Sequence, residues 1–329
     1  MTKTVVLCIF MVFLVTLIAC PVNSAFGRDI DHYSSYYLSP SDAPAKDGSI
    51  RVTFFGTTML LFDDGETQFL IDGFITRTSL RQLFLKRSVR TDTALVDAAL
   101  ARGKVGKPKV LFVAHSHYDH ALDIAYIAQK TNAQIYGSES TLNIGRGGGV
   151  PESQMTLLDL KQPTKVGQFT ITVLPSKHSP PTRGLNDDLG IVISEPLKQP
   201  ARPGAYTEGG SFDFVIKHGD HIILVKPSAN FVEGALDNVR AEVLFLATAT
   251  LGKQDQSFKD AFYNQTVGKV RPKLVIPVHW DSFFLPLNDH LEFLESNESD
   301  GFDFLIGRLS ADHIQFGIMQ GFQSIVLFK

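Results

Sequence analysis

The sequence predicts an α/β protein in which helices cover the sheets, and three observations lead to this class. A hairpin turn signal, Asp64-Gly65, separates two apolar runs between residues 50 and 74. A strand, a loop, a helix and a second strand follow one another between residues 109 and 137. Short apolar runs recur through the second half of the chain. Hairpins mixed with such βα units are typical of sheets covered by helices.

The individual elements follow from capping residues and apolar runs. The first predicted helix starts at a cap on Thr91 or Asp92 and stops at Gly103. Residues 109–114 predict a buried strand, and a second helix and strand follow at residues 121–130 and 133–137. Further strands are predicted at residues 168–174, 189–194, 212–217, 221–226, 242–248 and 273–278. His218 and His221 flank a tight turn, Gly219-Asp220, and we expect both to be exposed.

The N-terminal 48 residues are expected to lie outside the folded domain. Residues 1–20 predict a signal peptide, because their apolar run is shorter than the roughly 20 residues of a membrane span. The end of this segment, Leu17 to Cys20, resembles a bacterial lipobox, with lipidation at Cys20. Cleavage after Ser24 and an uncleaved anchor are the alternatives. Residues 21–48 predict a flexible tether, and residues 49–329 one domain.

Each of these readings of the leader places the protein outside the cytoplasm. We expect a periplasmic or membrane-anchored lipoprotein, or otherwise a secreted protein. Loss of the leader removes Lys3 and no acid, so 31 basic against 34 acidic residues become 30 against 34. This acidic balance argues against a nucleic-acid partner. The only cysteines are Cys8 and Cys20, so chemistry in the domain cannot use a thiolate.

Four potential metal ligands lie within six positions, directly after the predicted strand at residues 109–114. They are His115, His117, Asp119 and His120, in a chain that has only 10 histidines. In an extended segment His115 and His117 point the same way. Asp119 and His120 follow as the chain turns into a helix and can point to a second side. Neutral imidazole and carboxylate groups suit zinc, so the cluster predicts a metal site.

This cluster resembles the signature of the metallo-β-lactamase superfamily, and the resemblance covers residues 50–281. His178 and His279 each follow an apolar strand, where the superfamily places further ligands. Asp72 ends an early strand and matches the acid that supports the site. The resemblance implies a four-layer αββα sandwich. It also implies a first zinc site made of His115, His117 and His178, and a second made of Asp119, His120 and His279.

One position departs from the superfamily pattern. Many members have an aspartate that bridges both metals, and here Ser228 stands at the equivalent place. Two readings remain open: two Zn²⁺ held without a bridging carboxylate, or a weaker second site that is partly filled. His117 itself favours zinc and hydrolysis, because members that bind two irons for redox work usually have Glu at that position.

The resemblance implies a zinc-dependent hydrolase of small molecules. A zinc held by three imidazoles lowers the pKa of bound water to near 7, and the resulting hydroxide attacks an ester, lactone, amide or phosphodiester bond. Asp119 would orient the nucleophile and shuttle its proton, and Tyr118, Trp280 and Asp281 are candidates for the substrate pocket. The resemblance is nearer to the group with lactonases and phospholipase-D-like members than to dedicated β-lactamases. The alternatives are a non-catalytic, zinc-stabilised envelope binding protein and, third, a redox iron protein.

Overall fold

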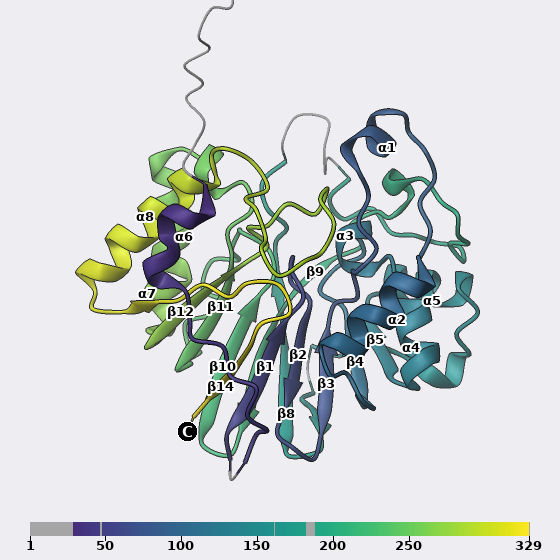
Figure 1. The fold of residues 1–329 in the computed structure, drawn as a ribbon, viewed down its shortest axis with the longest axis horizontal. Coiled ribbons are helices and arrows are strands. Elements are labelled where there is room, and N and C mark those ends of the chain that lie inside the picture. Colours follow the sequence, from purple (N-terminus) through teal and green to yellow (C-terminus); the bar gives the residue numbers. More distant parts are fainter. Residues whose placement is uncertain (1–28, 47, 161, 182–187, 329) are drawn as a thin grey trace, which may run out of the picture.

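The fold consists of two packed sheets with helices on their outer faces. The structure is a computed structural model that describes residues 29–46, 48–160, 162–181 and 188–328. Within these residues, two seven-stranded mixed sheets lie face to face, and helices cover both outer faces (Figure 1). The predicted α/β class and the αββα sandwich are therefore confirmed. In the described part of the chain, no helix is both long enough and apolar enough to cross a membrane.

The first sheet combines an antiparallel half with a parallel half. Its strands, in spatial order, are β14 (Ser324–Leu327), β1 (Ile50–Phe54), β2 (Leu60–Asp63), β3 (Gln68–Ile71), β4 (Val110–Phe112), β5 (Gln134–Gly137) and β6 (Met155–Leu157). Pairing is antiparallel from β14 to β3 and parallel from β3 to β6. The carboxyl ends of β3, β4 and β5 therefore meet at one edge, where ligands of such sheets gather.

The second sheet has a similar plan in the other half of the chain. In spatial order its strands are β13 (Gln315–Phe316), β12 (Leu274–Val278), β11 (Val243–Ala247), β10 (His221–Lys226), β9 (Ser211–His218), β8 (Phe169–Ser176) and β7 (Thr164–Val166). The strands from β10 to β13 run parallel, and those from β7 to β10 run antiparallel. Apart from residues 189–194, each predicted strand has an observed counterpart.

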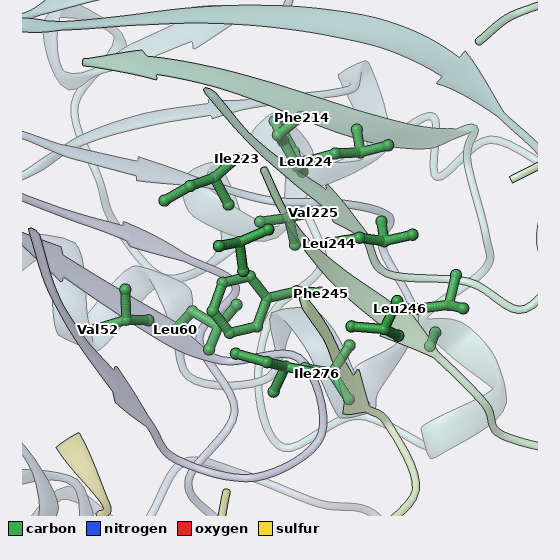
Figure 2. Close-up of a cluster of buried hydrophobic side chains, with 14 of the residues drawn as sticks. Val52, Leu60, Phe214, Ile223, Leu224, Val225, Leu244, Phe245, Leu246 and Ile276 are labelled. Carbon is green, nitrogen blue, oxygen red and sulfur yellow. The ribbon is translucent and has the colours of Figure 1, made fainter. Parts of the chain in front are cut away.

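Alternating side chains of the first sheet divide between two cores. In β2, Leu60 and Phe62 point into the space between the sheets, whereas Leu61 points to the outer face. Phe62 contacts Phe245 of the second sheet, with ring centroids 6.1 Å apart. Figure 2 shows Val52 and Leu60 in the same cluster as Phe245 of the facing sheet. This inner core joins the two sheets into one unit.

Helices bury the outer face of each sheet. On the first sheet, the outer core includes residues of α2 (Thr93–Arg102), α3 (Tyr118–Ala121), α4 (Ile124–Thr131) and α5 (Glu139–Gly147), while α1 (Leu80–Phe84) lies near them (Figure 1). On the second sheet, the covering helices are α6 (Gln256–Gln265), α7 (Val267–Val270) and α8 (Glu298–Ala311). Short 3₁₀ turns complete the fold at η1 (Ile30–Tyr36), η2 (Glu152–Gln154), η3 (Pro203–Ala205) and η4 (Leu251–Lys253).

The turn and helix-cap signals of the sequence correspond to specific backbone conformations and hydrogen bonds. Gly65 has a φ of +93°, and the side chain of Asp64 accepts hydrogen bonds from the backbone at the turn between β2 and β3. Helix α2 begins after Asp92, whose side chain accepts from Ala94 N and Leu95 N, and it ends at Gly103. Both predictions are confirmed.

The predicted tether is wrong for the part that the structure describes. Ile30 and Tyr33 are buried, Tyr33 packs on Phe302 of α8, and the Tyr33 hydroxyl donates a hydrogen bond of 2.8 Å to Asp303 of the same helix. The tyrosine-rich η1 therefore packs on the domain, although its neighbours have the composition of a linker. The predicted leader, residues 1–20 with Cys20, lies outside the described residues.

Two other expectations are also corrected. Residues 189–194 form no strand, because Gly190 turns the chain with a φ of +75° and Ile193 N donates to the side chain of Ser140 instead of to a neighbouring strand. His218 is buried rather than exposed. Its Nε2 lies 3.2 Å from Asp64 Oδ2, which belongs to the turn between β2 and β3. His221 is partly exposed and pairs with Glu242.

The burial of Glu298, at the start of α8, predicts that the stability of the fold decreases at high pH. The residue is 1% exposed, and burial raises the pKa of its carboxyl well above the usual value. The folded state therefore binds a proton that the unfolded state releases, and stability falls as pH rises above the unfolded pKa. We expect Glu298→Gln to unfold at higher urea concentration than the wild type at pH 8. The difference should shrink toward pH 5, and an equal difference at both pH values would contradict this assignment.

Candidate metal centre

Three separate strands deliver the candidate ligands to one edge of the sandwich. The segment from His115 to His120 follows β4 and enters α3, which lies where the ends of the two sheets meet (Figure 1). His178 comes two residues after β8, and His279 directly follows β12. The parallel and antiparallel pairings described above bring these three strand ends together. The two sheets thus bring histidines that are far apart in the sequence close together in space.

His115, His117 and His178 form the first group, called here the histidine trio. One ring nitrogen of each lies within 4.8 Å of the others. His117 Nδ1 and His178 Nε2 are 3.2 Å apart. His178 Nδ1 donates to the carbonyl oxygen of Ser179, which leaves its Nε2 lone pair facing the trio. Both ring nitrogens of His115 are buried and have no hydrogen-bond partner among the described residues.

Two imidazoles of the trio, His115 and His178, have lowered pKa values that favour their neutral form. Burial lowers the pKa of His115 well below its usual value, and the surrounding imidazoles lower it further. Burial and His117 together lower the pKa of His178 to about 3. Neutral imidazole is the form that binds a metal, and buried ring nitrogens without partners are rare unless a ligand satisfies them. The three converging imidazoles of the histidine trio therefore fit a divalent cation with an open coordination position.

Asp119, His120 and His279 form the second group, called here the mixed trio. His120 Nε2 lies 3.1 Å from His279 Nε2, and Asp119 Oδ2 lies 3.4 Å from His279 Nε2. Burial disfavours the charge on Asp119, but His120 and His279 outweigh it and lower the pKa of the carboxyl. An ionised carboxylate beside two imidazoles is also a donor set that suits a divalent cation.

The two trios are adjacent, and a supporting acid lies behind them. The ring centroids of His115 and His120 are 3.7 Å apart, so one histidine of each trio touches the other trio. Asp72, at the end of β3 with a φ of +58°, accepts from His120 Nδ1 at 2.7 Å and from Ala114 N at 2.8 Å. Burial opposes the charge on His120, but Asp72 and Asp119 outweigh it and raise its pKa. The bond to Asp72 directs His120 Nε2 toward the mixed trio.

Ser228 does not join either trio by a hydrogen bond within the described residues. It is buried just after β10, and its neighbours hold the segment that carries His178. Asn230 Nδ2 donates to the carbonyl oxygen of His178 at 2.7 Å, and Ala229 N donates to Ser179 Oγ at 3.0 Å. The segment at the position of the bridging aspartate thus contacts the histidine trio from outside.

The three candidate pocket residues have different surroundings. Tyr118 is half-buried and packs on Phe283, whose ring also contacts His279 with centroids 5.7 Å apart. Trp280 and Asp281 are 0% exposed, so neither lines an open pocket, and this expectation is corrected. Trp280 belongs to the core, where it packs on Phe293 and on Phe302 of α8.

Two residues of the site have no signal in the sequence that would identify them. Asp188 lies 3.1 Å from His117 Nε2 and can orient that imidazole from the opposite side of the histidine trio. Thr58, in the connection between β1 and β2, contacts both Asp72 and His120 Nδ1. Neither residue has a fixed spacing to a ligand. Only the fold brings them to the metal centre.

Comparisons with known proteins agree with this geometry. The model of a beta-lactamase superfamily domain matches residues 67–206, which contain the cluster and His178. A UPF0173 metal-dependent hydrolase from Pyrobaculum islandicum is 24% identical over 246 residues, 74% of this chain and 90% of that protein. Over these residues the chain is similar to the metallo-β-lactamase superfamily, as the sequence resemblance indicates. The predicted enzyme class, a metal-dependent hydrolase of this superfamily, is confirmed at this level.

Solved structures extend the comparison to the fold. A metallo hydrolase from Ignicoccus hospitalis superposes with a TM-score of 0.52 at 17% identity, over 85% of this chain and 100% of that one. A diiron β-hydroxylase from Streptomyces venezuelae gives 0.53 at 10% identity, over 88% of this chain and 55% of that one. These likenesses show the metallo-β-lactamase fold. They do not indicate which metal this chain binds, so that inference depends on the residues of the site.

Proposed function

We propose that this protein is a zinc-dependent hydrolase that uses two adjacent cations on an ester, lactone, amide or phosphodiester bond of a small molecule. The observation that carries this proposal is the pair of ligand trios, joined by the 3.7 Å contact between the rings of His115 and His120. Five of the six donors are imidazoles, which favour zinc over the harder cations. The metal-dependent hydrolases among the relatives support the reaction class.

Each trio has a separate part in this proposal. The histidine trio would hold the first cation, and the mixed trio would hold the second without a bridging carboxylate. When bound, a divalent cation acts as a Lewis acid toward water and toward the bond that is cleaved. His115 and His178, whose pKa values are lowered, would bind a cation without releasing protons, and the hydrogen bond to Asp72 orients His120 so that Nε2 faces the mixed trio.

Asp119 is the candidate catalytic group among the protein side chains. Its side chain is 11% exposed, so it reaches the solvent that enters the site, and its lowered pKa keeps it ionised at neutral pH. The carboxylate can orient an attacking water and accept its proton. Tyr118 lies beside it at the rim, where the half-buried ring can contact the part of the substrate that does not react.

Removal and return of the metal test the proposal directly. We expect chelation to abolish hydrolysis of a responsive substrate and added Zn²⁺ to restore it, because both trios then regain their cations. The panel should contain one ester, one lactone, one β-lactam amide and one phosphodiester. His117→Ala should not recover with Zn²⁺, whereas His290→Ala, which changes an exposed histidine elsewhere, should recover fully.

Two outcomes would count against the proposal. Undiminished turnover by the metal-free protein would contradict a metal-dependent reaction. Zinc binding without cleavage of any of the four substrate classes would favour the alternative of a non-catalytic envelope binding protein.

A further inference from the structure

The connection between β1 and β2 touches both histidines of the mixed trio, although it supplies no ligand. The carbonyl oxygen of Thr57 accepts a hydrogen bond of 2.5 Å from the backbone N–H of His279. The hydroxyl of Thr58 lies 2.9 Å from His120 Nδ1 and also donates to Asp72. Residues 56–58, called here the threonine turn, thus link two ligands that are 159 positions apart in the chain.

A buried ion pair holds the threonine turn in place. Asp281 Oδ1 accepts from Thr57 N at 2.6 Å, and Arg77 Nη1 donates to Thr57 Oγ1 at 3.0 Å. Arg77 Nη2 also donates to the carbonyl oxygen of Phe55 at 3.1 Å and lies 3.5 Å from Asp281 Oδ2. The side chains of Arg77 and Asp281 are 5% and 0% exposed, so water does not compete for these bonds.

The backbone of this junction is strained and closely packed. Thr57 and His279 have φ values of +51° and +55°, in the left-handed region that residues other than glycine rarely adopt. Gly56, with a φ of +84°, lies directly beside the ion pair of Arg77 and Asp281. A Cβ there would come within 2.4 Å of Arg77 Nη2 and 2.7 Å of Asp281 Oδ2. Such conformations persist only where the surroundings impose them, and here the ion pair supplies that constraint.

Stability alone does not account for the pair. Burial of two charges costs most of what their attraction returns, and well-packed apolar residues often replace such pairs without loss. The pair instead holds one backbone segment in place, because the hydrogen bonds of Arg77 and Asp281 all end on the threonine turn or on its neighbour Phe55. The turn then fixes the backbone of His279 and the ring of His120.

We infer that Arg77 and Asp281 are positioning residues for the second cation, acting through the threonine turn. This inference rests on the proposed function in that it takes the mixed trio to be a cation site. Loosening the turn frees His279 from its strained backbone and removes a contact on His120, while the histidine trio keeps its own supports on Asp188 and Ser179. The consequence is a selective loss of affinity at the mixed trio.

Zinc titration of the metal-free protein tests this inference without any substrate. The probe is Zn²⁺ in competition with a chromophoric chelator, which resolves a tighter and a weaker binding step. For Asp281→Asn we expect the affinity of the mixed trio to fall by about 10–100-fold, the usual effect of losing a support behind metal ligands. The affinity of the histidine trio should stay close to that of the wild type.

Asp63→Asn is the matched control. Asp63 pairs with Arg51 on the same two strands, β1 and β2, at the ends remote from the site, and the two side chains are each 10% exposed. This variant should leave both zinc affinities unchanged. Arg77→Lys provides a second test, because lysine keeps the charge and cannot bond Thr57 and Phe55 together. It should reproduce the selective loss even if Asp281→Asn does not fold.

The outcomes separate this inference from the proposed function. A wild-type protein that takes up no second zinc would contradict the two-cation function itself. A wild type with two sites, together with variants that keep the second site or weaken both sites equally, would overturn only the role of Arg77 and Asp281.

Discussion

Replacement of His115 by alanine should reduce hydrolysis to background and leave the fold intact. His115 is the one residue whose ring nitrogens are both buried without a partner among the described residues, so a cation is its natural partner. Its loss removes one of three ligands from the histidine trio. Lewis-acid catalysis contributes several kcal/mol to the barrier, and each 1.36 kcal/mol is a factor of ten. We therefore expect kcat/KM to fall by about 10³-fold or more.

The same variant should alter how zinc affects stability. A buried polar group without a partner costs about 1–3 kcal/mol, so removal of the imidazole offsets part of the cost of the cavity that alanine leaves. The metal-free variant should melt close to the metal-free wild type. Saturating Zn²⁺ should raise the Tm of the wild type and raise that of the variant far less. His290→Ala is the control for both readouts, and unchanged turnover by His115→Ala would remove the histidine trio from the mechanism.

Replacement of Asp119 by asparagine should have the second largest effect, on turnover rather than on metal content. Asparagine keeps the shape of the side chain and one oxygen that can accept a hydrogen bond or bind a metal beside His279 and His120, whereas its amide cannot accept a proton. Positioned general bases contribute about 10²–10⁴-fold, so we expect kcat to fall within that range. The variant should retain its first zinc, and the second should bind more weakly.

The measurement pairs steady-state kinetics with metal analysis on the same preparation of Asp119→Asn. A fall in kcat with the first zinc retained would agree with proton transfer by Asp119. Unchanged turnover would exclude that role. Loss of both zincs would show that Asp119 acts mainly as a structural ligand.

The parts of the site that sequence analysis could predict are local or tied to the ends of strands. Four of the ligands lie within six consecutive positions: His115, His117, Asp119 and His120. Their spacing indicates a metal site without any tertiary information. The positions of His178 and His279 after strands, together with the family resemblance, predict that both are ligands. The structure brings all six residues together.

The parts that could not be predicted depend on contacts between distant segments. Arg77 and Asp281 meet across 204 positions (281 − 77), and neither follows a pattern that distinguishes a positioning residue from a surface charge. Trp280 follows a ligand and has the aromatic character of a pocket residue, yet its ring completes the core beside α8. Only the direction of the chain after β12 separates these two roles, and the left-handed backbone of His279 sets that direction.

The same reasoning explains the errors in the fold. The segment around Tyr33 has the composition of a linker, and its burial depends on Asp303 and Ser299, which lie more than 260 residues later. His218 flanks a turn, and turns are usually exposed. Here a second hairpin packs over it and supplies Asp64 as a partner. Local composition does not contain either contact.

Metal content per chain tests the central claim most directly. Elemental analysis of the purified protein should find close to two zincs per chain, which together would occupy the histidine trio and the mixed trio. One zinc per chain that rises to two with added zinc would agree with a weaker mixed trio. A folded protein that contains no metal and takes up none from added Zn²⁺ would contradict the account, because the buried imidazoles would then need another explanation.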